Sequence, residues 1–464
     1  MRDLSALIKA YDVRGVVPDQ WGPDLAREVG IAFVEILGIR VSDGGAGKVV
    51  VGHDMRPTGP ELVNAFIQGV TSAGVDVINI GLCSTDGLYF ASGRLALPGA
   101  MFTASHNPAE YNGIKMCRAG AAPVGQDSGL ADIRKMLESE SFPTYSGPTG
   151  SATEQDLLSE YASHLRNLVP LENIRPLSVV IDTGNGMGGF TVPAVLGGQL
   201  LPPLPLQIDE MYFALDGTFP NHEANPIDPE NLRDLQKRVL ELGADLGLAF
   251  DGDADRCFVV DEKGDIVDPS TLTSLIATRE LAKNPGSTII HNLITSKAVP
   301  EIVLENGGKP VRTRVGHSFI KATMAETDAV FGGEHSGHFY FRDFWKADSG
   351  MLAAMHALAA LGETQPGTTL SQLLAPFSRY ASSGEINTTV SDAQLVISKI
   401  REVFTARGAS FDTLDGLTVT GNNWWFNVRA SNTEPLLRLN VEGNDSATME
   451  SIRDEVLALM KADY

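Results

Sequence analysis

The feature that most constrains the fold is an apolar segment that ends abruptly in a stiff polar loop. Residues 99–102 are apolar, and the sequence TASHNP follows at 103–108. An apolar run that ends in Ser, Asn and Pro predicts a buried strand that leaves its sheet through a tight turn. The hydroxyl of Ser105 would then lie at the edge of the sheet, where open α/β sheets bind ligands. A serine held there could carry a covalent group, and a surface serine in a polar turn is the alternative.

A second apolar segment, residues 246–250, runs into the acidic sequence DGDADR at 251–256. Alternate side chains of an extended loop point the same way, so Asp251, Asp253 and Asp255 can converge on one hard cation. Three bare carboxylates would repel one another, which favours a bound ion. A helix–loop–helix calcium site needs Gly at the sixth position, where this chain has Arg256. A solvated acidic turn is the remaining alternative.

Strand and helix patterns alternate along most of the chain. Strands are predicted at 48–52, 75–82, 177–181 and 288–292, and helices at 60–73, 154–168, 229–242 and 270–281. This alternation predicts mixed sheets with helices on both faces. The glycine-rich segment 182–189 precedes a helix, and a tight crossover beside the acidic loop is favoured over a phosphate-binding turn of backbone amides. In the last part of the chain the patterns predict a strand at 385–390, a helix at 393–406, strands within 417–441 and a helix at 446–460. This order is typical of an α+β layer.

A chain of 464 residues is too long for one hydrophobic core and should divide into several domains. Segment 141–151 is rich in Pro, Gly and Ser and predicts the first boundary. We expect three consecutive mixed-sheet α/β domains followed by an α+β C-terminal domain. Their expected ranges are residues 1–147, with the serine loop; 148–253, with the acidic loop; 254–370; and 371–464.

The composition restricts the class of ligand. A formal net charge of −22 argues against nucleic acid as a partner, because phosphate backbones need a basic surface. No apolar run could span a bilayer and no signal sequence is evident, so a cytoplasmic location without membrane contact is expected. The three cysteines lack metal-ligand spacing and indicate buried thiols. A phosphorylated ligand would need cations gathered locally, and the candidates are Arg14, Lys115, Arg256 and Arg429.

Five short sequences occur in a characteristic order: TASHNP, YNGIK at 111–115, DGDADR, GEHSGH at 333–338 and RASNT at 429–433. In this combination the chain resembles the α-D-phosphohexomutase family, of the bacterial phosphomannomutase/phosphoglucomutase type. The resemblance implies four domains arranged around a central cleft. It also implies a phosphoserine at Ser105 and one Mg²⁺ held by Ser105, Asp251, Asp253 and Asp255.

The resemblance implies roles for further residues. The catalytic set would be Ser105, His106, Lys115 and Arg256, with either Lys115 or His106 taking the proton from the attacking hydroxyl. Lys115 is favoured, on the expectation that nearby cations lower its pKa. Sugar and phosphate contacts would be Tyr11, Arg14, His317, Glu334, Ser336, His338, Arg429, Ser431, Asn432 and Thr433. A capping role is the alternative for His317. One departure from close relatives is that Ile294 stands near a position where they carry a substrate lysine, with Lys297 three residues later.

The implied activity is interconversion of hexose 6-phosphate and hexose 1-phosphate through a hexose 1,6-bisphosphate intermediate, which also acts as activator. Glu334 and Ser336 would bind the C3 and C4 hydroxyls, which glucose and mannose share, so both phosphosugars should be substrates. Phosphoglucosamine mutase, a metal-dependent sugar phosphatase and a non-catalytic phosphosugar-binding protein are the alternatives. The protein should be a monomer or a homodimer.

Overall fold

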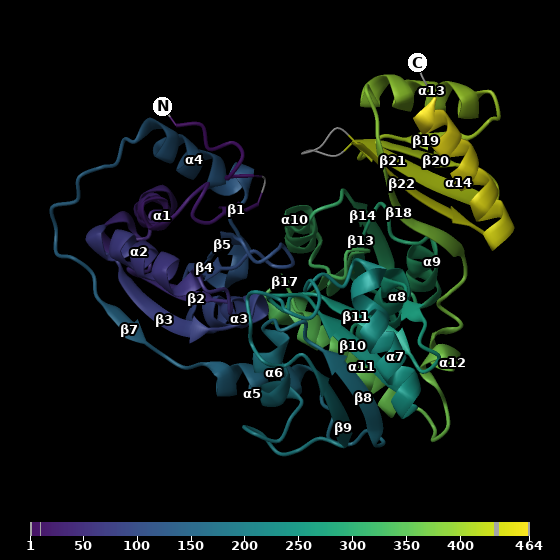
Figure 1. The fold of residues 1–464 in the computed structure, drawn as a ribbon, viewed down its shortest axis with the longest axis horizontal. Coiled ribbons are helices and arrows are strands. Elements are labelled where there is room, and N and C mark those ends of the chain that lie inside the picture. The colour runs from purple at the N-terminus through teal and green to yellow at the C-terminus, as the bar shows by residue number, and fades with distance from the viewer. Residues whose placement is uncertain (1, 10, 431–435, 463–464) are drawn as a thin grey trace. The chain divides into compact units, whose positions relative to one another are not determined.

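The computed structural model describes residues 2–9, 11–430 and 436–462 of the chain. These residues form successive sheets with flanking helices, drawn in Figure 1. They divide into two compact units. The first comprises Met1–Val267 with Ser336–Leu373, and the second comprises Asp268–His335 with Leu374–Tyr464. Each unit is described below by itself.

The first sheet belongs to the first unit and has the order β1-β5-β4-β2-β3-β7, with β6 paired to β5. Strands β2, β3, β4 and β7 run parallel, whereas β5 is antiparallel to both β4 and β1. The sheet is therefore mixed, as the alternation of strands and helices predicts. The strand bounds are β1 (Val13–Val16), β2 (Lys48–His53), β3 (Asp76–Leu82), β4 (Gly99–Phe102), β5 (Tyr111–Arg118), β6 (Ala122–Pro123) and β7 (Ala152–Glu154).

Helices cover both faces of this sheet. Three of them share one hydrophobic cluster with β2, β3 and β4, and they are α1 (Pro23–Leu37), α2 (Gly59–Ser72) and α4 (Leu130–Ser139). Helix α3 (Thr85–Leu95) lies outside that cluster and packs on β4 and β2 from the other side. Helix α1 begins with proline and ends at Gly38 in the left-handed conformation, the usual start and stop signals of a helix.

The second sheet, also in the first unit, has the order β12-β11-β10-β8-β9. Its strands are β8 (Leu177–Asp182), β9 (Leu206–Met211), β10 (Leu246–Phe250), β11 (Cys257–Asp261) and β12 (Ile266–Val267). Strand β10 is buried along its whole length, as its unbroken apolar sequence requires. The helices of this part are α5 (Leu158–Leu168), α6 (Gly188–Val195), α7 (Arg233–Leu242) and the fully buried α11 (Gly350–Gly362), and the hairpin strands are β16 (Phe339–Phe341) and β17 (Ala347–Asp348).

The second unit begins with parallel strands. Strand β13 (Thr288–Asn292) lies between β14 (Lys309–Thr313) and β15 (Phe331–Gly333). The accompanying helices are α8 (Pro269–Lys283), α9 (Ala298–Glu305) and α10 (His317–Thr327). The short helix α12 spans Leu370–Leu374.

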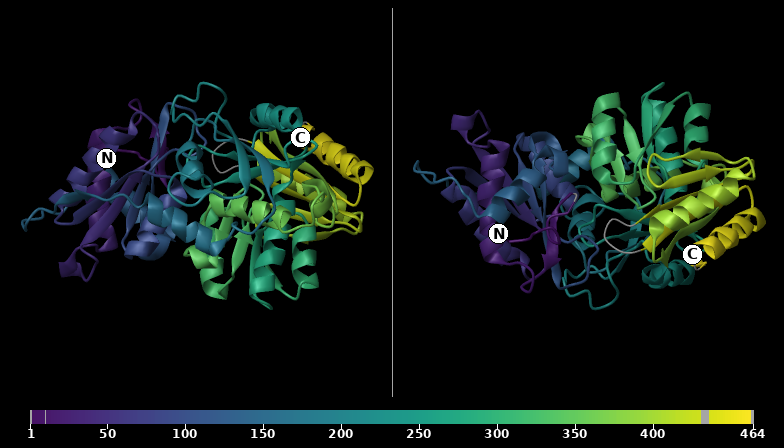
Figure 2. Two further views of the ribbon diagram at one scale, coloured as in Figure 1. Left: turned by 90° about the horizontal axis from the view of Figure 1, so that it is seen from below. Right: turned by 90° about the horizontal axis from the view of Figure 1, so that it is seen from above.

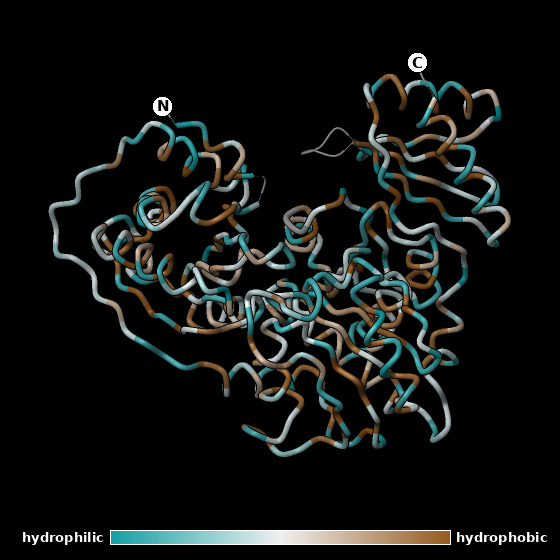
Figure 3. Tube along the Cα trace, in the orientation of Figure 1, coloured by the Kyte–Doolittle hydropathy of each residue, from teal (hydrophilic) through white to brown (hydrophobic). Residues whose placement is uncertain are grey.

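The last part of the second unit is an antiparallel sheet with the order β18-β22-β21-β20-β19. Helices α13 (Ala393–Thr405) and α14 (Ser446–Lys461) pack beside each other on this sheet, as Figure 2 shows. Both helices carry hydrophobic and hydrophilic residues along their length, which is typical of helices with one buried face (Figure 3). This is the α+β layer that the sequence predicts. The strands are β18 (Ala381–Thr389), β19 (Ser410–Asp412), β20 (Leu417–Thr420), β21 (Trp424–Ala430) and β22 (Leu436–Gly443).

Three predicted elements begin four residues away from the observed start. The helix predicted at 154–168 begins only at Leu158, because Glu154 still belongs to the edge strand β7 and Asp156 accepts a hydrogen bond from the backbone N–H of Leu158. The helix predicted at 229–242 is α-helical only from Arg233, because Pro229–Leu232 forms a 3-10 helix, and the strand predicted at 385–390 begins earlier, at Ala381. None of the described helices is both long enough and apolar enough to cross a bilayer.

Candidate active site

Ser105 stands on the loop that follows β4, and its backbone adopts the left-handed conformation with φ = 50°. The backbone N–H of Ser105 donates to Oγ1 of Thr103 over 2.8 Å, which closes the turn. A non-glycine residue in this region of φ is uncommon and is often found at functional sites. The turn breaks the alternation of the strand and directs the Ser105 hydroxyl toward the end of β10. Only 1% of the residue is exposed.

A fully buried arginine supports the loop that carries Ser105. Arg56 follows β2, and its guanidinium donates to the carbonyl oxygens of Ser105, Asn107, Pro108 and Tyr111 over 2.7–2.9 Å. The charge of Arg56 is paired with the buried carboxylate of Asp54, 3.3 Å from Nε. Loop carbonyls without partners would be costly to bury, so Arg56 both stabilises the loop and fixes its shape.

The acidic loop after β10 brings three buried carboxylates together. Oxygens of Asp251, Asp253 and Asp255 all lie within 4.8 Å of one another. The hydroxyl of Ser105 donates to Oδ2 of Asp251 over 2.9 Å, across 146 residues of sequence. The structure thus brings together Ser105 and the three aspartates that the sequence predicts as one group.

The two loops meet through glycines. A Cβ at Gly252 would lie 2.4 Å from the carbonyl oxygen of Ser105, so a side chain there would clash with backbone. On the other side, the N–H of Met187 donates to the carbonyl of Gly252 over 2.8 Å, and a Cβ at Gly186 would lie 2.6 Å from the same oxygen. The glycine-rich segment therefore forms the crossover beside the acidic loop that the sequence favours.

The aspartate group fits a divalent cation. Oδ1 of Asp253 and Oδ1 of Asp255 are buried and have no hydrogen-bond partner among the described residues. Burial and the neighbouring carboxylates Asp255 and Asp253 raise the pKa of Asp251 well above its usual range. Oxygen ligands that are buried, ionisable and left without partners are what Mg²⁺ requires.

Lys115 points from β5 into this acidic group. Its Nζ lies 2.8 Å from Oδ2 of Asp253 and 2.6 Å from Oδ2 of Asp255. Burial lowers the pKa of Lys115, but the two carboxylates outweigh burial and raise it above its ordinary value. The expectation that nearby cations lower the pKa of Lys115 is therefore wrong, because its closest charged neighbours are anions. By the same contact Lys115 holds the pKa of Asp253 below its usual range against the effect of burial.

His106 and Arg14 also contact the loop that carries Ser105. Nδ1 of His106 is 3.2 Å from the Ser105 hydroxyl, and burial together with Arg256 and Arg14 lowers the pKa of His106 well below its usual value. Nη1 of Arg14 donates to the side-chain oxygen of Asn107 over 2.7 Å. Tyr11, which is half-buried, belongs to the same compact unit.

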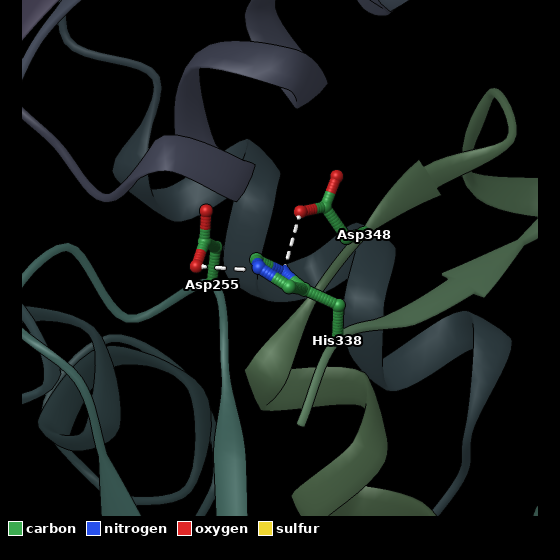
Figure 4. A group of neighbouring side chains, drawn as sticks. All are labelled: Asp255, His338 and Asp348. Carbon is green, nitrogen blue, oxygen red and sulfur yellow. Dashed lines mark ion pairs between the residues drawn. The ribbon is translucent and has the colours of Figure 1, made fainter. Parts of the chain in front are cut away.

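Arg256 and His338 adjoin the acidic loop and belong to the same unit. The backbone N–H of Arg256 donates to Oδ1 of Asp251 over 3.1 Å, and its Nε donates to Nε2 of His338 over 3.0 Å. His338 in turn faces Asp255 and Asp348 (Figure 4). The predicted residue Ser336 is half-buried on the same segment.

The remaining predicted contacts belong to the second unit. Oε1 of Glu334 accepts from the N–H of Gly316 over 3.2 Å, so Glu334 lies beside the turn that precedes His317, the first residue of α10. Arg429, on β21, donates to Oε2 of Glu385 over 2.6 Å. This carboxylate comes from β18 and is not evident from the sequence around Arg429. The predicted residues Ser431, Asn432 and Thr433 lie outside the described residues.

Three residues of this region were not predicted. They are Arg56, Asp348 and Thr85, whose hydroxyl donates to Oδ2 of Asp253 over 2.6 Å. A signal exists for Arg56, because it is a charged residue in the exit loop of a buried strand and directly precedes a proline in HDMRP. The sequences around Thr85 and Asp348 carry no recognisable motif, and only the tertiary structure brings these two residues to the site.

Sequence and structure comparisons identify relatives of the chain. The four family models of phosphoglucomutase/phosphomannomutase match in order: alpha/beta/alpha domain I at residues 5–144, domain II at 159–264, domain III at 268–380 and the C-terminal domain at 385–459. These matches confirm that the chain contains four domains of the predicted types. The boundaries at 147, 253 and 370 stay predictions.

Whole-chain relatives are also found. A phosphomannomutase of Escherichia coli is 39% identical over 458 residues and is covered to 98% on both chains. A protein of Xanthomonas campestris pv. campestris named "Phosphohexose mutases" is 40% identical, also with 98% coverage of both. The crystal structure of a phosphoglucomutase/phosphomannomutase family protein from Burkholderia thailandensis superposes with a TM-score of 0.87 at 34% identity, covering 99% of this chain and 98% of that one. The chain therefore belongs to the phosphoglucomutase/phosphomannomutase family.

Proposed function

We propose that this protein is a phosphohexomutase that interconverts hexose 6-phosphates and hexose 1-phosphates through a phosphoserine at Ser105. The observation that carries the proposal is the contact between the Ser105 hydroxyl and Asp251 within a buried group of three aspartates. A surface serine would have no such partner. The names of the whole-chain relatives support the same class of reaction.

Asp251, Asp253 and Asp255 would hold one Mg²⁺, together with an oxygen of the phosphorylated Ser105. When bound, the ion would neutralise negative charge on the transferring phosphoryl group. The protein itself supplies further positive charge. Arg256 is held beside Asp251, and Arg14 is held beside Asn107, two residues from the serine. Such fixed charges stabilise the transition state without reorganisation.

Two transfers complete the reaction. In the first, the bond between phosphorus and Oγ of Ser105 breaks, a bond forms between phosphorus and a sugar hydroxyl oxygen, and the proton of that hydroxyl ends on Oγ. The product is a hexose 1,6-bisphosphate. In the second transfer the bond between the other phosphorus and its sugar oxygen breaks, that phosphorus bonds to Oγ, and the proton of Oγ ends on the released sugar oxygen, which gives the hexose monophosphate product. Nδ1 of His106 lies 3.2 Å from Oγ and is placed to exchange that proton. Lys115 is the alternative group for the proton of the sugar hydroxyl.

We also propose contacts with the sugar and with the phosphate that is not being transferred. Glu334 and Ser336 would bind ring hydroxyls, with His317 and Tyr11 as further contacts. Arg429 and the segment 431–433 would bind the phosphate that is not being transferred. Because the C3 and C4 hydroxyls have the same configuration in glucose and mannose, a site that binds those two cannot separate the sugars strongly.

A coupled assay with mannose 1-phosphate, glucose 1-phosphate and glucosamine 1-phosphate, each with a trace of the matching bisphosphate, tests the proposal. We expect turnover of the first two with kcat/KM values within about a thousandfold, roughly 4 kcal/mol. A larger ratio would disprove the dual specificity. Release of free phosphate at the rate of substrate loss would instead identify a phosphatase. Equal failure of all three sugars would reject the proposed activity.

A further inference from the structure

The loop of residues 212–221, which follows β9, lies against the arginine that supports the Ser105 loop. Its backbone approaches Arg56 closely, because a Cβ at Gly217 would lie 2.7 Å from Cα of Arg56. The ring of Phe219 lies against the guanidinium of Arg56, whose Cζ is 5.2 Å from the ring centroid. The same guanidinium donates to four carbonyl oxygens of the loop that carries Ser105. The 212–221 loop therefore contacts the group that fixes the shape of the proposed catalytic loop.

One buried residue, Asn185, holds the 212–221 loop by four hydrogen bonds. Its backbone N–H donates to the carbonyl of Tyr212 over 2.8 Å, and its own carbonyl accepts from the N–H of Asp216 over 3.0 Å. Its side-chain Nδ2 donates to the carbonyl of Ala214 over 2.8 Å, and its Oδ1 accepts from Nδ2 of Asn221 over 2.7 Å. Asn185 is only 4% exposed. Hydrogen bonds that satisfy a buried amide are costly to break, so they hold the loop firmly.

The backbone conformation of Asn185 explains why asparagine suits this position. Its φ is 60°, in the left-handed region, which asparagine adopts more readily than most residues other than glycine. The next residue, Gly186, lies against the acidic loop, since a Cβ there would lie 2.6 Å from the carbonyl oxygen of Gly252. The same turn therefore contacts both the acidic loop and the 212–221 loop.

We propose that Asn185 is a positioning residue for phosphoryl transfer, which holds the 212–221 loop against Arg56 and thereby limits the movement of the loop that carries Ser105. The proposal rests on the proposed function of Ser105. Because one guanidinium binds four carbonyls of the Ser105 loop, a shift of Arg56 moves the whole loop. A displacement of the reacting group by about 1 Å can lower the rate about a hundredfold.

The first test compares Phe219→Leu, which removes the ring from Arg56, with Phe219→Tyr, which keeps it. We expect kcat of Phe219→Leu to fall about 3- to 30-fold while KM for the phosphosugar changes less than about twofold. Phe219→Tyr should keep at least about half of the wild-type kcat. The control is Phe142→Leu, which shortens a half-buried ring packed on the core of the same unit and should keep full activity. An unchanged kcat in Phe219→Leu, or an equal loss in Phe219→Tyr, would overturn the proposal.

Asn185→Gly tests the side-chain hydrogen bonds without adding backbone strain, because glycine adopts a positive φ at no steric cost. We expect kcat to fall about 10- to 100-fold and KM to change less than about threefold. Asn306→Gly, which loses a side-chain hydrogen bond at the end of α9, is the control and should match the wild-type protein. All variants are assayed at a temperature at which urea unfolding shows them to be folded. A folded Asn185→Gly protein with wild-type kcat, or with a raised KM alone, would overturn the proposal.

A double-mutant cycle shows whether the 212–221 loop acts through Arg56. The guanidinium is absent in Arg56→Lys, so adding Phe219→Leu to that variant should change kcat by less than about twofold. An equal loss in the wild-type and Arg56→Lys backgrounds would mean that the loop acts independently of Arg56, and the proposed route would be wrong.

Hydrogen exchange tests the same link without any assay of turnover. Backbone N–H groups within residues 103–111 form hydrogen bonds inside the Ser105 loop, so their exchange reports its opening. Mass spectrometry of the full-length protein should show these residues exchanging at least about threefold faster in Asn185→Gly and Phe219→Leu than in the wild-type protein, and at the wild-type rate in Phe219→Tyr. A wild-type rate in Asn185→Gly would overturn the link even if the mutase activity is confirmed. If no mutase activity is found, the exchange rates still decide whether Asn185 restrains the Ser105 loop.

Discussion

Nζ of Lys115 lies 2.6 Å from the carboxylate of Asp255, so a cation of the protein occupies one side of the group proposed to bind a metal ion. The same ammonium contacts Asp253. Lys115 therefore offsets part of the electrostatic repulsion among the three buried carboxylates in the absence of an ion. It also opposes the binding of a second positive charge. These two effects can be separated by substitution.

Lys115→Met should tighten Mg²⁺ binding by about tenfold, roughly 1.4 kcal/mol, because removal of a fixed charge relieves Coulomb repulsion. Turnover should fall, since Lys115 also serves the proposed reaction. Isothermal titration with MgCl₂ and a coupled assay measure the two effects. Lys237→Met, an exposed lysine on α7, is the control and should change neither. Weaker Mg²⁺ binding in Lys115→Met would contradict the assignment of the aspartates as the metal site.

Ser105→Ala should lose bound phosphate and mutase activity together, with kcat reduced at least about a thousandfold, because the nucleophile is removed. Intact-mass measurement of protein incubated with glucose 1,6-bisphosphate shows whether a phosphate is carried. Ser139→Ala, at the exposed end of α4, should retain both phosphate and activity. Phosphate that persists in Ser105→Ala would place the modification at another residue.

Arg56→Met should destabilise the protein by roughly 3–5 kcal/mol, because it leaves the buried carboxylate of Asp54 unpaired and four loop carbonyls without donors. Arg56→Lys keeps the charge but cannot reach all four carbonyls, so its stability should lie between those of Arg56→Met and the wild-type protein. Denaturant unfolding monitored by fluorescence gives the free energies. Arg94→Lys, an exposed arginine on α3, should be neutral.

Any folded Arg56→Lys protein should show a lower kcat than the wild-type protein, because the loop that carries Ser105 loses part of the support that Arg56 provides. A full kcat in that variant would mean that the loop keeps its shape without the fourfold contact. Arg56 would then serve stability alone.

Asp86 gives a prediction for pH. Burial raises the pKa of Asp86 to about 6, although the hydroxyls of Ser349, Ser84 and Tyr161 donate to it and act in the opposite direction. The folded protein therefore binds the proton more tightly than the unfolded chain. The stability that the protonated carboxyl contributes is present at low pH and is lost as the pH rises toward and through 6.

Asp86→Asn removes this dependence. The free energy of unfolding of Asp86→Asn minus that of the wild-type protein should increase by about 2 kcal/mol between pH 4 and pH 7, because only the wild-type protein loses stability over this range. Urea unfolding at several pH values measures the difference. Asp343→Asn, an exposed carboxylate, should shift by less than about 0.5 kcal/mol over the same range. A relative stability that does not change with pH would show that folding does not raise the pKa of Asp86.

Local patterns were sufficient to predict much of this molecule. The apolar run before Asp251 becomes β10, and the polar sequence after residue 102 becomes the loop that carries Ser105, because both signals are contained in a few consecutive residues. The antiparallel last sheet and its two helices follow from period and spacing in the same way.

Contacts between distant segments were not predictable. Nothing near residue 115 indicates that two aspartates of another sheet raise the pKa of Lys115. The four carbonyls bound by Arg56 belong to a loop about fifty residues away, and Glu385 reaches Arg429 only because β18 and β21 flank β22 in one sheet. The sequence identifies the chemical groups, and the topology decides which of them neutralise one another.

The close approach of Gly252 to the carbonyl of Ser105 has a consequence for biosynthesis. During translation Ser105, the proposed nucleophile, leaves the ribosome 146 residues before Asp251, its hydrogen-bond partner. Domains generally fold as units, the N-terminal one first. A nascent first domain thus presents Ser105 without the acidic loop that later buries it. The group proposed to bind the metal ion is complete only when more than half of the polypeptide has been made.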